Sequence, residues 1–216
     1  KNKVNLEFEA SVCGGVPIIR SLKEGLIANK IYKVFGIFNG TSNYILSSMD
    51  KENKSFKEVL KKAQKLGYAE SNPTSDLNGE DVASKLKILS SLCFNSFLNN
   101  NIHVEGIKDI DKDDINYAKR LGYKIKLLGY AELIGKDIFQ RVHPTLIKNS
   151  SYVGSIDGVL NAVIIEGNPV GQSIIQGEGA GPAATTSALI SDISSILRGN
   201  IKFPFSISNK ERKSLN

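Results

Sequence analysis

The spacing of apolar residues changes near residue 122, and this change limits the possible folds more than any other feature. Before it, Leu60, Ala63 and Leu66 recur at helical spacing, and Gly67 and Gly122 stand where glycines commonly end helices. After it, short segments of strand-forming residues alternate with Gly, Asn and Pro. The order predicts an α+β fold: a mixed, largely antiparallel sheet with helices packed on one face.

The same patterns locate the individual elements. Strands are expected at 4–12, 31–38, 123–134, 138–147, 159–166 and 170–176, with a hairpin turn at 167–169. Helices are expected after Pro17, from Thr41 or Ser42 to Met49, from Ser55 to Leu66, from Gly79 to about Phe94, and over 111–121 and 182–198. Residues 68–77 are expected to form a loop.

Composition narrows the class of protein. With 216 residues, 41% of them hydrophobic, the chain is long enough for a substantial core. Half of the net charge of +6 lies in a basic stretch at 199–216, and the Lys residues are otherwise scattered, so a nucleic-acid partner is the least favoured interpretation. Cys13 and Cys93 have no metal-ligand spacing, and no apolar run would span a bilayer. We therefore expect a cytoplasmic protein with no membrane partner. Because the sequence begins KNKVNLEFEASV, we also expect it to be a fragment of a longer protein.

The helix after Gly79 carries an acidic and a basic residue inside its apolar sector. Val82, Leu86 and Leu89 form a narrow stripe, and Asp81 and Lys85 lie beside it, four residues apart. One interpretation is a salt bridge on the flank of the helix. The other is a partly buried pair at the edge of a cleft, where the lysine could transfer a proton.

Two further carboxylates precede this helix. Glu70 and Asp76 lie in the segment that leads to it, together with Pro73 and Gly79. Carboxylates near a lysine would suit an amino-acid substrate, because they accept hydrogen bonds from its ammonium group. Asp76 has a structural alternative, since aspartate is also common in turns and at helix starts.

Two glycine-rich stretches are weaker signals. GEGAG at 177–181 precedes a helix, so its backbone N–H groups could approach an anion, although Pro182 breaks the dinucleotide-binding pattern. EASVCGGVP at 9–17 could place backbone carbonyls and Glu9 around a cation. A simple tight turn explains either stretch equally well.

Four blocks of the sequence, taken together, resemble homoserine dehydrogenase. They are EASVCGGVPIIRSL at 9–22, GIFNGTSNYIL at 36–46, AQKLGYAESNPTSDLNGEDVASKLKIL at 63–89 and GEGAGPAATTSALISDI at 177–193. The resemblance covers roughly residues 5–198, and the third block is the most specific. It implies the catalytic domain of an enzyme that interconverts L-homoserine and L-aspartate 4-semialdehyde with NAD or NADP, in threonine, methionine and isoleucine biosynthesis.

The resemblance also implies roles for single residues. Lys85 would transfer the proton and Asp81 would hold it and the substrate. The substrate pocket would include Glu70 and Asp76. The remaining assignments are Gly67 and Gly179 at the cofactor, and Glu9 with the carbonyls of Val12, Gly14 and Val16 at a sodium ion. Two positions depart from the family pattern: Asn72 replaces an acid, and Cys13 replaces a glycine.

At the level of domains, the resemblance implies that residues 1–180 form the substrate-binding, catalytic and dimerisation domain. Residues 181–198 would form a helix that packs on a separate nucleotide-binding domain, and 199–216 a basic tail. That nucleotide-binding domain does not occur in the sequence, so we expect the isolated chain to be inactive. The alternative from another class is a non-catalytic dimerisation or regulatory module.

Overall fold

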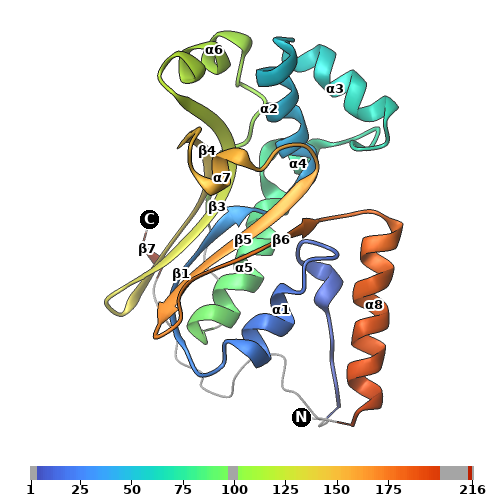
Figure 1. Cartoon of the computed structure of the whole chain (residues 1–216), viewed down its shortest axis with the longest axis vertical. Coiled ribbons are helices and arrows are strands. Elements are labelled where there is room, and N and C mark those ends of the chain that lie inside the picture. Colours follow the sequence, from blue (N-terminus) through green and yellow to red (C-terminus); the bar gives the residue numbers. More distant parts are fainter. Residues whose placement is uncertain (1–3, 97–101, 200–213, 216) are drawn as a thin grey trace.

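A single sheet organises the computed structural model, which describes residues 4–96, 102–199 and 214–215. Its strands are ordered β2-β4-β3-β1-β5-β6, with β7 paired to β4, and both β2 and β7 run parallel to β4, whereas the other pairs are antiparallel. The strand bounds are β1 (Lys30–Ile37), β2 (His103–Val104), β3 (Tyr123–Ile134), β4 (Asp137–Lys148), β5 (Leu160–Asn168), β6 (Gly171–Glu178) and β7 (Ser214–Leu215). The expected mixed, largely antiparallel sheet is confirmed (Figure 1).

Two long hairpins form most of this sheet. β3 and β4 pair over their full length, from Tyr123 opposite Lys148 to Ile134 opposite Asp137, and Gly135 in the turn has a positive φ of 63°. β5 and β6 pair from Leu160 opposite Glu178, and the predicted Gly-Asn-Pro segment lies at their turn. β1 lies between the two hairpins and joins them.

Most helices lie on one face of the sheet, as the sequence predicts. The helix bounds are α1 (Ile18–Arg20), α2 (Gly40–Glu52), α3 (Phe56–Lys65), α4 (Thr74–Asn78), α5 (Glu80–Phe94), α6 (Lys112–Arg120), α7 (Tyr152–Ser155) and α8 (Pro182–Leu197). The buried stripe Val82, Leu86 and Leu89 of α5 packs into the main core with Val34 of β1 and Leu127 of β3. A smaller core on the opposite face gathers residues of β1, β3 and β5 under the short helix α7.

The strand expected at 4–12 is wrong. Residues 4–8 have no regular structure, and Glu9–Ser11 form a 3₁₀ helix, η1. The polar groups of this segment bond to helices rather than to a strand: the Glu9 N–H donates to Asp192 of α8 at 3.0 Å, and the Glu9 carboxylate accepts from backbone N–H groups of α1. Figure 1 shows the segment running beside α8.

Helix starts also differ from expectation. Asn39 caps α2, because its side-chain oxygen accepts the N–H of Ser42 at 2.8 Å, so neither Thr41 nor Ser42 is the cap. The expected loop at 68–77 contains most of the one-turn helix α4 (Thr74–Asn78), and Gly79 caps its end with φ of 83°. The π-helix η2 (Ser21–Gly25) continues α1. Ser55 caps α3 as predicted.

α8 is amphipathic with its apolar side outward. Its buried positions are Ala188, Asp192 and Ser195, at helical spacing, and they face the N-terminal segment. Large apolar side chains cover the opposite side and are 45–81% exposed: Leu189, Ile190, Ile193, Ile196 and Leu197. Figure 1 shows α8 beside the N-terminal segment rather than over the sheet. The helix therefore presents an uncovered apolar surface.

No helix within the described ranges is both long and apolar enough to cross a bilayer.

Candidate active site

Lys85 and Asp81 form a close ion pair near the start of α5. The Lys85 Nζ lies 2.7 Å from the Asp81 Oδ2 and donates a second hydrogen bond to the backbone carbonyl of Phe38 at 2.9 Å. Their side chains are 18% and 27% exposed, so the pair is reachable from solvent while most of its surface is covered. The lysine is therefore held both by the aspartate one turn earlier and by the carbonyl that follows β1.

Asn39 connects this pair to Asp76. The Asn39 side-chain amide donates to the Asp81 Oδ2 at 2.9 Å and to the Asp76 Oδ1 at 2.8 Å. Asp76 and Asp81, which the sequence places in a loop and a helix, thus meet through one amide group at the start of α2. The sequence analysis missed Asn39; its position between a strand and a helix signals a cap, but not the second use of its side chain.

Glu70 is not bonded to this network. Its side chain is exposed and makes no hydrogen bond or ion pair within the described residues. The loop that carries it is nevertheless fixed to α2, because the Thr41 hydroxyl donates to the Tyr68 carbonyl at 2.7 Å and the Tyr44 and Tyr68 rings lie 4.9 Å apart. Gly67, just before, ends α3 with φ of 76° and open space around it.

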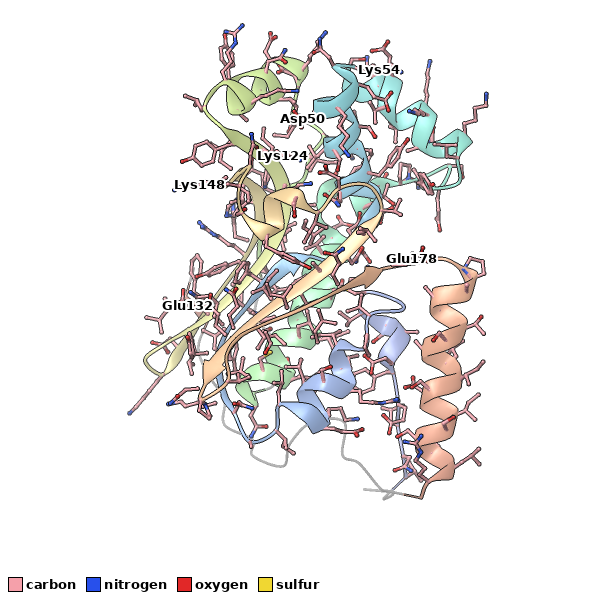
Figure 2. The ribbon with its side chains drawn as sticks, in the orientation of Figure 1. Asp50, Lys54, Lys124, Glu132, Lys148 and Glu178 are labelled. Atoms are coloured by element: carbon pink, nitrogen blue, oxygen red, sulfur yellow. The ribbon has the colours of Figure 1, made fainter. Side chains whose placement is uncertain are left out.

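The two glycine-rich stretches pack against each other. The Gly15 N–H donates to the Glu178 carbonyl at 3.1 Å, and a Cβ on Gly14 would lie 2.4 Å from the carbonyl oxygen of Gly179. A Cβ on Gly179 would lie 2.1 Å from the side chain of Asn161. Only glycine fits at either position. The two glycine-rich stretches can therefore pack this closely only because each carries a glycine at its point of contact. Glu178 marks the point where β6 leads into this turn (Figure 2).

Cys13 and Asn161 lie beneath this turn. Cys13 has φ of 55°, the left-handed conformation that favours glycine. Burial raises the pKa of the Cys13 thiol to about 11, and Lys85 and Asp81 are close enough to act on it electrostatically. Asn161 is buried, and apart from the weakly bonding Cys13 thiol its amide has no polar partner among the described residues.

Glu9, Val12, Gly14 and Val16 are all buried. The two oxygens of Glu9 accept the N–H groups of Ile19 and Arg20 at 2.7 and 2.8 Å; burial raises the pKa of Glu9, and these bonds only partly offset the effect. A carboxylate is a hard oxygen donor of the kind that suits an alkali cation, but both Glu9 oxygens already accept backbone N–H groups. The described residues contain no cluster of three or more His, Cys, Asp or Glu that would suit other metals.

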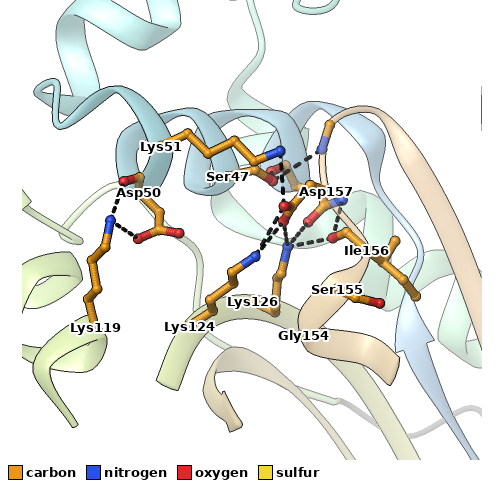
Figure 3. Close-up of polar contacts among 12 residues, drawn as sticks. Ser47, Asp50, Lys51, Lys119, Lys124, Lys126, Gly154, Ser155, Ile156 and Asp157 are labelled. Atoms are coloured by element: carbon orange, nitrogen blue, oxygen red, sulfur yellow. Dashed lines mark hydrogen bonds and ion pairs between the residues drawn. The ribbon is translucent and has the colours of Figure 1, made fainter. Parts of the chain in front are cut away.

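A second charged cluster surrounds Asp157, at the end of the sheet near α2. Lys51, Lys124 and Lys126 approach its carboxylate to 2.9–3.2 Å (Figure 3). Lys126 is 1% exposed, and its three donors are used by Asp157, the Asn43 side chain and the Ile156 carbonyl. Burial raises the pKa of Asp157, but the lysines outweigh it and lower the pKa to about 2. With every donor of Lys126 satisfied, this cluster fixes α2 to β3.

The fold and site together define an α+β domain in which a lysine pairs with one carboxylate, an asparagine links that carboxylate to a second, and a turn is made of two packed glycine motifs. The family model described as "Homoserine dehydrogenase" matches residues 17–194, and the chain belongs to that family. It is 53% identical to the homoserine dehydrogenase of Helicobacter pylori over 88% of this chain and 46% of that protein. The chain thus spans about half the length of the curated relatives it matches.

Solved structures agree with this assignment. A homoserine dehydrogenase from Thiobacillus denitrificans superposes with a TM-score of 0.92 and 42% identity, over 96% of this chain and 51% of that one. A hyperthermophilic archaeal homoserine dehydrogenase mutant in complex with NADPH superposes with a TM-score of 0.73 and 26% identity, over 90% of this chain and 56% of that one.

Proposed function

We propose that the chain is the catalytic part of a cytoplasmic, NAD(P)-dependent homoserine dehydrogenase, which interconverts L-homoserine and L-aspartate 4-semialdehyde. The observation that carries the proposal is the hydrogen-bonded network of Lys85, Asp81, Asn39 and Asp76 in a member of this family. A flank salt bridge alone would require neither the Phe38 carbonyl on the lysine nor a second carboxylate on the same amide.

In the reductive direction, Lys85 donates a proton to the C4 carbonyl oxygen while carbon C4 becomes the alcohol carbon. The nicotinamide of the bound cofactor supplies the hydride. In the oxidative direction, Lys85 accepts the hydroxyl proton. Asp81 and the Phe38 carbonyl hold the Lys85 nitrogen in place for either transfer.

Glu70 and Asp76 bind the substrate's ammonium group. The hydrogen bond from Asn39 uses one oxygen of Asp76 and leaves the other for the substrate. Glu70 is exposed on a loop that Thr41 fixes, so its carboxylate is available to a ligand. Because carboxylates accept strong hydrogen bonds from ammonium groups, these two residues select an amino acid over a simple aldehyde.

Gly67 and Gly179 lie at the cofactor. Gly67 is exposed with open space around its Cα, and Gly179 belongs to the turn that leads into α8, so both leave room for a close ligand. Glu9 and the carbonyls of Val12, Gly14 and Val16 hold a sodium ion, which would support the turn against which Gly179 packs.

The apolar outer side of α8 packs against the nucleotide-binding half of the intact protein. Residues 1–180 then form the substrate-binding half, and residues 199–216, most of which lie outside the described residues, form the basic tail. Because that other half binds most of the cofactor, the isolated chain does not turn over. The five exposed apolar side chains of α8 support this arrangement, since such a surface is costly in water.

A homodimer forms through the open face of the sheet. Phe35, Tyr130 and Phe139 make a row of ring contacts across β1, β3 and β4, with centroids 6.1 Å apart, and the Arg141 guanidinium lies over the last two rings. Aromatic and arginine side chains are enriched at the centres of interfaces between proteins. α7 covers only one end of this face.

The test is an assay of the intact protein and of the isolated chain with aspartate semialdehyde and NADPH or NADH. We expect the intact protein to oxidise the cofactor, and the isolated chain not to. An intact, folded protein that shows no turnover in either direction would contradict the proposed activity and favour a non-catalytic module.

A further inference from the structure

We propose that Asn39 is a positioning residue for the proton-transfer pair, an inference that rests on the proposed function. The two N–H bonds of its side-chain amide point to Asp76 and to Asp81, at 2.8 and 2.9 Å. Its oxygen accepts the Ser42 N–H at 2.8 Å. Every polar group of the side chain is thus used, and only one of these bonds serves the cap of α2.

The bond to Asp81 restricts how that carboxylate can turn. Oδ2 of Asp81 accepts from both the Asn39 amide and the Lys85 ammonium, from two different elements. Lys85 is held in turn by the carbonyl of Phe38, the residue just before Asn39. Two consecutive residues at the junction of β1 and α2 therefore fix both members of the pair, and Asn39 itself is only 5% exposed.

The amide also keeps two carboxylates close together. Asp76 and Asp81 each lie within hydrogen-bonding distance of one nitrogen, where two unscreened negative charges would repel. A neutral donor between them stabilises both ionised forms. The titratable groups that face this point are Asp76 of α4, Asp81 and Lys85 of α5, and the Cys13 thiol.

Two substitutions in the intact protein separate positioning from capping. Asn39→Ser keeps an acceptor for the Ser42 N–H but is too short to reach both carboxylates. Asn39→Asp also keeps the acceptor, and replaces the donor with a third carboxylate. Ser55→Ala is the matched control, because it removes the cap of α3, where the Ser55 hydroxyl accepts the Glu58 N–H, away from the site.

We expect Asn39→Ser to lower kcat about 10- to 100-fold. Ser55→Ala should lose a similar amount of Tm but keep the kcat of the unsubstituted protein. Asn39→Asp should lower kcat further, because it removes the same two hydrogen bonds and places a third negative charge beside Asp76 and Asp81. An unchanged kcat in both variants would overturn the proposal and leave Asn39 as a cap only.

A second measurement does not depend on turnover. Carbon-13 NMR of the aspartate carboxyls in the intact protein should show changed Asp76 and Asp81 resonances in Asn39→Ser, because each carboxylate loses its hydrogen bond from the amide. If the protein proves inactive but these resonances change, the proposed activity fails and the positioning role stands. If the protein is active and neither the resonances nor kcat change, only the positioning role fails.

Discussion

The Lys85 ammonium lies 2.7 Å from the Asp81 carboxylate one helical turn earlier in α5, and 2.9 Å from the carbonyl at the end of β1. This geometry makes Lys85→Ala in the intact protein the most direct test of proton transfer. We expect kcat to fall at least about 100-fold, because positioned acid–base groups contribute that much, while KM changes far less. Steady-state kinetics in both directions measure the effect.

The matched control is Lys87→Ala, which removes the same charge from the same helix. Lys87 takes no part in the network of Lys85, Asp81 and Asn39, so its loss should leave kcat near the unsubstituted value. Equal losses in the two variants would indicate a general effect of charge on α5, and near-normal kcat in Lys85→Ala would remove Lys85 from the chemistry.

Removing the charge of Asp157 should greatly lower the stability of the fold. Asp157→Asn would leave the charge of Lys126, which is 1% exposed, without its counterion, so the free energy of unfolding should fall by about 3 kcal/mol. Urea unfolding measures the change. The control is Glu52→Gln: hydrogen bonds from Lys54 and Lys62 also lower the pKa of Glu52 to about 2, but both lysines are exposed, so their ion pairs should contribute little.

The same cluster around Asp157 should make the stability of the fold depend on pH. The pKa of Asp157 in the folded protein, about 2, lies below its ordinary value of 3.8. The contribution of its ionised form to the free energy of unfolding is therefore fully present above pH 3.8 and is lost as the pH falls toward 2. The gap in stability between the unsubstituted chain and Asp157→Asn should therefore narrow over that interval. A gap that stays constant down to pH 2 would show that Asp157 is not held ionised by its lysines.

Local pattern was enough for most elements but not for the contacts between them. Strand 123–134 matches β3, because its alternation and bounding glycines are local signals. The segment 4–12 is not the strand that its residues predict, since the Glu9 N–H donates to Asp192 of α8, 183 residues away, and the Glu9 carboxylate accepts an N–H of α1. Asp81 and Lys85 were identified from helical spacing, whereas Asn39 was not, because its two carboxylate partners lie 37 and 42 residues away.

If the protein dimerises through the open face of the sheet, a charged side chain placed on that face should prevent the dimer from forming. Phe139→Glu would place a carboxylate in the aromatic row, directly across from Glu132 on β3, so the mass measured by light scattering should fall from dimer to monomer. Leu146→Glu is the control, since Leu146 is 53% exposed and points to the other face of the same strand. An unsubstituted protein that is already monomeric would contradict the proposed interface.

The outer side of α8 predicts an effect on the cofactor from residues that do not touch the substrate. Ile190 and Ile193 are 59% and 56% exposed and lie on one side of the helix. If the proposed packing against a nucleotide-binding half holds, replacing both with lysine should weaken that packing and raise KM for NADPH in the intact protein. In the isolated chain, the same change should lower the binding of a hydrophobic dye.

The control for this pair is Leu121→Lys, which removes a large apolar side chain that is 70% exposed at the end of α6. It should lower dye binding without changing KM, because α6 packs near α2 and β3 rather than beside α8. If the double variant of α8 keeps the unsubstituted KM and kcat, the outer side of α8 does not contact the nucleotide-binding half. Its exposed apolar side chains would then have to be covered by a different partner.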